Sequence, residues 1–131
     1  MTNIQRITPV QAKEILDVET GALLIDVRTK MEYTFVGHPI GALHIPIQES
    51  PAWETLDNFI DNVTQATGKN VPLVLMCRSG VRSMKAAEIL AQAGFQNLYN
   101  MEEGFEGDKD DNKHRSTTGG WRFHKLPWEQ G

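Results

Sequence analysis

The chain has a single cysteine among its 131 residues, Cys77. One thiol cannot form a disulfide within the chain, and with only four histidines present a cysteine-based zinc site is not expected. We therefore predict no bound metal and expect any role of Cys77 to be chemical.

Long apolar runs and positive net charge are also missing. No stretch approaches the roughly 20 apolar residues that cross a bilayer, and the first residues show no basic region followed by an apolar one. The formal net charge of -4 at pH 7 does not favour nucleic acid or an anionic membrane surface as a partner. These absences predict a soluble cytoplasmic protein with neither kind of partner.

Acidic residues are missing from one internal segment, although the chain as a whole is acidic. Between Asp61 and Glu88 there is no Asp or Glu. The same segment contains Cys77 and four basic residues, which are Lys69, Arg78, Arg82 and Lys85. A thiol in such electropositive surroundings predicts a small anionic substrate.

Length and composition predict one domain over residues 1–131. Hydrophobic residues make up 40% and charged residues 23%, which is typical of a globular domain. A polar excursion is expected at about 106–118, and its acidic residues lack the spacing of a calcium loop. The aromatic C-terminal segment 119–131 is expected to pack back onto the sheet, because Trp121 and Trp128 would otherwise form an exposed apolar patch.

The chain alternates strand-like and helix-like segments. Apolar runs predict strands at 22–27, 43–45, 71–76 and 97–101. Capping residues, apolar spacing and terminal glycines predict helices at 9–18, 29–35, 50–60 and 83–93. Connections of this length predict an α/β fold whose parallel strands are covered by helices on both faces. Cys77 then lies at the carboxyl end of a strand, where such sheets place their sites.

The helix predicted to begin at Ser50 and Pro51 rests on the spacing of three apolar residues. Trp53, Leu56 and Ile60 follow one another at intervals of three and four, the period of a helix face that packs on a core. Trp53 is therefore interpreted as a core residue rather than as a surface for substrate.

The segment Cys77-Arg78-Ser79-Gly80-Val81-Arg82 is the candidate active-site loop. The N-terminus of the following helix, the two arginines and nearby serine hydroxyls all favour a thiolate. Gly80 permits a loop whose N–H groups form an anion cradle. We predict that Cys77 is the nucleophile, and that the two arginines argue against a buried, inert cysteine. The predicted substrate-binding residues are Arg78, Ser79, Gly80, Val81 and Arg82.

The ordered set LLIDVR followed by EY, GHPIGALHIPI and LVLMCRSGVRS resembles the single-domain rhodanese family over about residues 8–105. The resemblance implies a rhodanese-like three-layer fold with a central five-stranded parallel sheet. It also implies a sulfurtransferase in which Cys77 takes a sulfane sulfur from thiosulfate or a related donor as a persulfide. The acceptor would be cyanide or a thiol, a protein thiol included, and no cofactor is needed.

Two alternatives remain open on the same residues. One is a cysteine-dependent phosphatase or arsenate reductase, and the other is a sulfur-delivery or binding module that acts on a partner protein thiol. Four residues separate Cys77 from Arg82, whereas cysteine phosphatases have five, so the ring of N–H groups should be too tight for phosphate.

Other polar residues near the motifs are interpreted as structural. Asp26 is expected to support the fold by pairing with an arginine or accepting from loop N–H groups. Arg28 and Glu32 are expected to form an ion pair that fixes the short helix. His38 and His44 are expected to be structural or surface groups.

Overall fold

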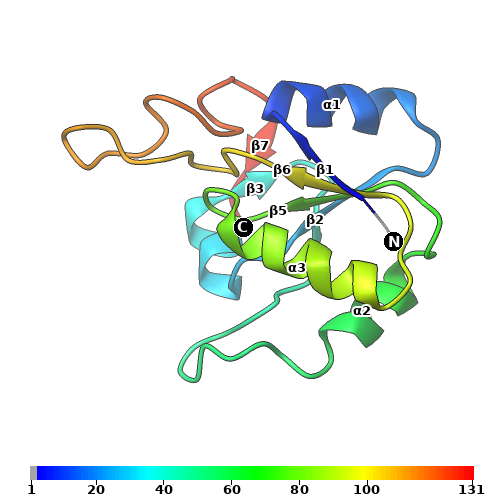
Figure 1. The fold of residues 1–131 in the computed structure, drawn as a ribbon. Coiled ribbons are helices and arrows are strands. Elements are labelled where there is room, and N and C mark those ends of the chain that lie inside the picture. The colour runs from blue at the N-terminus through cyan, green and yellow to red at the C-terminus, as the bar shows by residue number, and fades with distance from the viewer. Residues whose placement is uncertain (1–2) are drawn as a thin grey trace.

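A computed structural model describes residues 3–131 and has a central parallel sheet of five strands (Figure 1). The strands are β1 (Ile4–Ile7), β2 (Leu23–Asp26), β4 (Leu43–His44), β5 (Leu73–Met76) and β6 (Leu98–Met101). Their order is β1-β6-β5-β2-β4, and every neighbouring pair is parallel. The predicted five-stranded parallel sheet is confirmed, and β5, which leads to Cys77, lies in its middle.

Helices cover both faces of the sheet, as predicted. In Figure 1, α1 (Pro9–Val18) lies on one face, and α2 (Phe59–Ala66) and α3 (Val81–Gln92) lie on the other. Strand β5 supplies both cores, because Leu73 and Leu75 pack with α2 and α3 while Val74 and Met76 pack with α1. Burial on two faces explains why this strand reads as a continuous apolar run. Over residues 3–131 no helix is both long and apolar enough to cross a membrane.

Local capping explains where two of the helical segments begin. The Thr8 hydroxyl accepts from the Gln11 N–H, and the Gln11 side chain accepts from the Thr8 N–H, so α1 opens with the predicted capping box. The short helix predicted after Thr29 is present as η1 (Glu32–Val36), a single turn of π-helix. Glu32 and Thr29 bond to each other at its start, as their spacing predicted.

The prediction of a helix that begins at Ser50 is wrong. Residues 48–57 form a loop that is closed by a Gln48–Thr55 bridge and by a 2.8 Å hydrogen bond from the Leu56 N–H to the Ile47 carbonyl. Helix α2 begins only at Phe59. The two ends of this loop hydrogen-bond to each other, so the chain between them is not helical. The apolar spacing of Trp53 and Leu56 therefore does not define a helix face. Trp53 is 52% exposed, so its interpretation as a core residue is also wrong.

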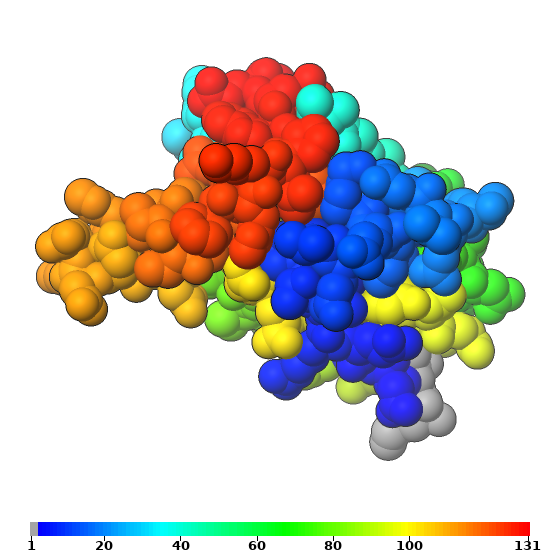
Figure 2. Space-filling view, turned by 90° about the horizontal axis from the view of Figure 1, so that it is seen from above, coloured from blue at the N-terminus to red at the C-terminus, as the bar shows by residue number. Residues whose placement is uncertain are grey.

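After β6 the chain extends away from the sheet and its helices, and then packs back against them. Residues 107–118 form a projecting arm, drawn orange in Figures 1 and 2. The residues that follow lie against α1 in Figure 2, where Trp121 is 2% exposed within the core on that face. Strand β7 (Trp128–Glu129) then pairs antiparallel with β3 (His38–Pro39). The expected packing of Trp121 is confirmed, whereas Trp128 is 41% exposed, so the expectation that its ring is covered is wrong.

Candidate active site

Cys77 directly follows β5 in sequence and lies four residues before α3 begins at Val81. Its thiol sulfur accepts a hydrogen bond from the Gly80 N–H at 3.1 Å, and the Ser83 hydroxyl lies 3.4 Å from it. Gly80 has a φ of 106°, a left-handed value that glycine adopts without steric penalty, and the chain passes at this residue from the loop into α3. Cys77 is 1% exposed, so the inference that the neighbouring arginines keep it from being buried is wrong.

A chain of polar side chains connects the loop to β6. The Ser83 hydroxyl donates to the Asn100 side-chain oxygen at 2.5 Å, and the Asn100 amide donates to the Gly80 carbonyl at 3.2 Å. Asn100 therefore bonds to both residues, Gly80 and Ser83, that lie beside the Cys77 sulfur. Sequence reasoning missed Asn100, and its only signal was a polar residue inside an otherwise apolar strand.

A backbone turn after β6 holds the start of the loop from the other side. The Phe105 N–H donates to the Cys77 carbonyl at 2.9 Å, and the Glu106 and Gly107 N–H groups donate to the Arg78 carbonyl at 3.0 and 3.2 Å. These bonds attach the backbone of Cys77 and Arg78 to the 105–107 segment. Gly104 makes the close approach possible, since a Cβ there would lie 2.5 Å from the Arg78 carbonyl carbon.

Arg82 is held by Glu32 from η1. The two side chains form a bidentate ion pair at 2.7 and 2.8 Å across 50 residues of sequence. Burial alone would raise the pKa of Glu32, but the Arg82 guanidinium and hydrogen bonds from Thr29 outweigh it and lower that pKa from 4.5 to about 2. Its hydrogen bond with Glu32 in turn raises the pKa of Arg82. Arg82 therefore fixes the end of the loop against η1.

Arg28 does not pair with Glu32, so that prediction is wrong. Its guanidinium instead binds Asp26 at 2.9 and 2.6 Å, and both side chains are fully buried. The Asp26 carboxylate also accepts from the Arg28 N–H, which confirms the supporting role predicted for it. The Arg28 guanidinium lies 4.6 Å from the centre of the Phe105 ring. This contact ties the buried pair to the turn beneath the loop.

The candidate loop lies between two surface clefts. Arg78 and Arg82 line a cleft of about 390 Å³, whereas Ser79, Gly80 and Val81 line another of about 490 Å³. Val81 is 77% exposed. Because its side chain is apolar, the hydrogen-bond donor that it can offer to a ligand is its backbone N–H. Arg78 is exposed, and its guanidinium has no ionic or hydrogen-bonding partner within residues 3–131. Of the two arginines, only Arg78 has its charge available to a ligand.

The two histidines of the glycine-rich connection are structural, as expected. His38 stacks on Tyr33 with ring centres 3.6 Å apart, and its Nδ1 lies 2.8 Å from the Tyr33 carbonyl. His44 Nε2 lies 2.8 Å from the Arg28 carbonyl. Both rings stack on Tyr33 of η1, and His38 Nε2 also lies 3.5 Å from the Glu129 carboxylate.

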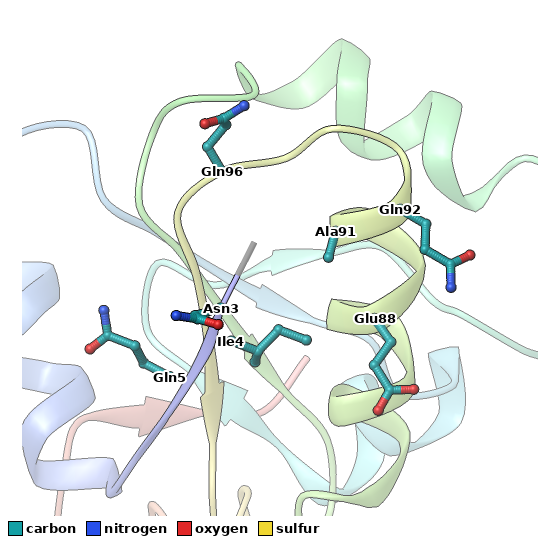
Figure 3. Close-up of a pocket in the computed structure, with 7 residues that line it drawn as sticks. All are labelled: Asn3, Ile4, Gln5, Glu88, Ala91, Gln92 and Gln96. Carbon is teal, nitrogen blue, oxygen red and sulfur yellow. The ribbon is translucent and has the colours of Figure 1, made fainter. Parts of the chain in front are cut away.

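A cavity of about 690 Å³ lies at the opposite end of α3 from Cys77. Figure 3 shows Ala91 of this helix end and Ile4 of β1 directed toward each other, and Glu88, Gln92 and Gln5 complete the lining from the same two elements. The residues that line the cavity supply amide groups and one carboxylate but no thiol or hydroxyl. Size alone therefore does not locate the chemistry of this protein.

The Glu32–Arg82 pair predicts a pH-dependent contribution to stability. Because the pKa of Glu32 is about 2 in the folded chain and 4.5 ordinarily, the contribution is complete above about pH 4.5 and is lost as the pH falls toward 2. Glu32→Gln should reduce the free energy of unfolding by about 1 to 2 kcal/mol near neutral pH, allowing for solvent screening of a partly exposed pair. Urea unfolding of both proteins across this range measures the difference, which should shrink toward zero at low pH. A difference that stays constant would contradict the assignment.

Comparisons with known proteins agree on one family. The model of the rhodanese-like domain matches residues 8–111. RP600 of Rickettsia prowazekii is 33% identical over 96% of this chain and 98% of its own length. The thiosulfate sulfurtransferase GlpE of Haemophilus influenzae strain PittEE is 32% identical over 80% of this chain and 88% of its own. The crystal structure of Rv0390 from M. tuberculosis is 36% identical, with a TM-score of 0.89 over 99% of this chain and 100% of that one.

Proposed function

This chain belongs to the rhodanese-like domain family, and on that premise we propose that it is a thiosulfate-type sulfurtransferase that works through a persulfide on Cys77. The observation that carries the proposal is the Gly80 N–H, which donates to the Cys77 sulfur from a tight loop at the start of α3. A donor fixed there stabilises negative charge on sulfur, both on the attacking thiolate and on the persulfide.

The proposed reaction has two displacement steps. The Cys77 thiolate attacks the outer sulfur of thiosulfate, the S–S bond of the donor breaks, and sulfite leaves with the bonding electron pair. The acceptor, cyanide or a thiolate, then attacks the outer sulfur of the Cys77 persulfide. Thiocyanate or the acceptor persulfide leaves, and the electron pair of the broken bond restores the Cys77 thiolate.

The loop residues take different roles in this proposal. The N–H groups of Ser79, Gly80 and Val81 form the cradle for the outer sulfur, and the exposed Arg78 attracts and orients the donor dianion. Arg82 has its guanidinium committed to Glu32 and acts mainly by fixing the loop.

Arg78→Ala should therefore raise the KM for thiosulfate by about fivefold to tenfold with a smaller change in kcat. Loss of one exposed charge removes attraction for the dianion but leaves the cradle in place. Added salt should weaken thiosulfate binding in the wild type more than in the variant, because salt screens the exposed charge. Steady-state kinetics at two ionic strengths measure both effects. An unchanged KM would assign donor binding to the backbone alone.

The proposed function is tested by the mass of the intact protein and by its choice of substrate. Thiosulfate should add one sulfur atom, cyanide should remove it as thiocyanate, and aryl phosphates and arsenate should remain unreacted. The four-residue interval between Cys77 and Arg82 supports this choice, since the short ring is sized for one anionic sulfur. Aryl phosphate or arsenate turnover without sulfur loading would support the phosphatase or reductase instead. Sulfur loading with transfer only to a protein thiol would support the delivery module.

A further inference from the structure

We propose that the cleft beside Arg78 is the acceptor subsite, and that it takes a small zwitterionic thiol that carries both an ammonium and a carboxylate, as free cysteine does. The assignment rests on the proposed sulfurtransferase function and names the acceptor class. Three features of the cleft carry it, which are its position, its charges and the exposed Trp53.

The cleft lies against the active-site loop and has the size of a small-molecule site. Its walls are the 48–53 segment on one side and the Thr29–Glu32 segment on the other, and Arg78 and Arg82 come from the loop itself. Its volume of about 390 Å³ falls within the range of small-ligand pockets. An acceptor bound here would contact Arg78, the residue that directly follows Cys77 in the loop.

The charged groups of the cleft leave one free charge of each sign. Arg82 and Glu32 neutralise each other as a bidentate pair. Arg78 has no ionic partner within residues 3–131. The Glu49 carboxylate accepts one hydrogen bond, from the Lys30 N–H at 2.7 Å, and forms no ion pair in the described chain. Arg78 and Glu49 together therefore match a ligand with a carboxylate and an ammonium.

Trp53 adds an aromatic surface to the same wall as Glu49. Its backbone N–H donates to the Glu49 carbonyl at 2.9 Å, and its φ of 59° is a left-handed value that is uncommon outside glycine. Its side chain is 52% exposed yet lines the cleft. Strained backbone that displays a large ring is frequent at binding sites, and an indole face attracts ammonium groups.

These features suit the acceptor better than the donor. The Glu49 carboxylate repels a thiosulfate dianion, and cyanide is too small to reach Glu49, Arg78 and Trp53 together. Because sulfite leaves before the acceptor binds, Arg78 serves the donor first and the acceptor carboxylate afterwards. The acceptor thiolate then attacks the outer sulfur, the bond from that sulfur to Cys77 breaks, and the electron pair returns to Cys77. The aminothiol leaves as its persulfide, with no net oxidation.

The experiment starts from protein that thiosulfate has already loaded with sulfur and that has been freed of excess donor. Discharge is followed by intact mass with four thiols of similar size, which are L-cysteine, cysteamine, 3-mercaptopropionate and 2-mercaptoethanol. In that order, these thiols carry both an ammonium and a carboxylate, the ammonium alone, the carboxylate alone, and neither group. Each rate is expressed relative to wild type with the same thiol, so that differences in intrinsic thiol reactivity cancel.

Glu49→Gln keeps an acceptor for the Lys30 N–H but removes the charge. It should slow discharge by cysteine and cysteamine about fivefold, and should leave discharge by 3-mercaptopropionate unchanged or faster. Trp53→Ala should slow the two ammonium thiols about threefold to fivefold relative to 2-mercaptoethanol. Phe123→Ala removes an aromatic ring that is 41% exposed outside this cleft, and as the matched control it should show no such selectivity.

Equal effects of Glu49→Gln on all four thiols would overturn the acceptor assignment while leaving the sulfurtransferase function intact. Discharge by a protein thiol that is faster than discharge by cysteine and independent of Glu49 would overturn it in favour of a protein acceptor. Failure of thiosulfate to load the wild-type protein would be seen before any acceptor is added. That result would overturn the proposed function and this assignment together.

Discussion

Cys77→Ser should abolish both sulfur loading from thiosulfate and thiocyanate formation, with a loss of at least about a thousandfold in kcat/KM. A serine hydroxyl is a far weaker nucleophile than a thiolate and cannot hold a sulfane sulfur as a persulfide. The chain has no second cysteine that could take over. Intact mass after thiosulfate treatment and a thiocyanate assay measure the two losses.

The exchange of sulfur for oxygen is close to isosteric at a site that is 1% exposed, so the variant should remain folded. Its urea unfolding curve, compared with that of wild type, is the control for this point. Transfer that persists in a folded Cys77→Ser protein would contradict the persulfide mechanism.

Gly104→Ala should disrupt the loop that begins at Cys77 and lower the free energy of unfolding by about 3 kcal/mol or more. The new Cβ would lie 2.5 Å from the Arg78 carbonyl carbon and oxygen and 2.6 Å from the Cys77 carbonyl oxygen, so the loop backbone must move. The φ of 64° adds the penalty of a left-handed conformation. Urea unfolding and the rate of sulfur loading measure the two effects.

Gly41→Ala is the matched control for this prediction. Gly41 also has a left-handed φ, of 86°, but a Cβ there would meet nothing within 4 Å. The control should therefore lose about 1 to 2 kcal/mol from the conformational penalty alone and keep its sulfur-loading rate. Equal destabilisation of the two variants, with loading intact in both, would show that the 104–107 turn does not hold the loop.

The features that the sequence predicted correctly are those determined by residues close together in the chain. The strand before Cys77 and the helix after it follow from an apolar run and from a segment rich in helix formers, and the structure has both as β5 and α3. The capping boxes at Thr8 and Thr29 follow from three-residue spacing. In each case the interacting groups lie within one helical turn of sequence, so the local pattern is sufficient.

Partners that are distant in sequence could not be predicted in this way. Glu32 has both Arg28 and Arg82 available, and only the fold decides that the partner 50 residues away is the one it binds. Asn100 and the turn at Gly104 reach the loop from β6 for the same reason. The edge strand β1 was missed because two of its four residues are exposed and its apolar signal is short.

The backbone bonds that hold the loop also set an order of events during synthesis. Cys77 leaves the ribosome before Gly104 and the turn that fixes its carbonyl. That turn is itself held by later residues. The Trp121 backbone N–H donates to the Gly104 carbonyl at 2.9 Å, and the Gly120 N–H donates to the Glu103 carboxylate at 3.0 Å. A nascent chain that has exposed β5 and α3 alone therefore carries the thiol without its assembled loop. Cys77 gains its final surroundings only when residues up to about Trp121 have emerged and docked, so a chain arrested earlier would contain the cysteine but not the folded loop around it.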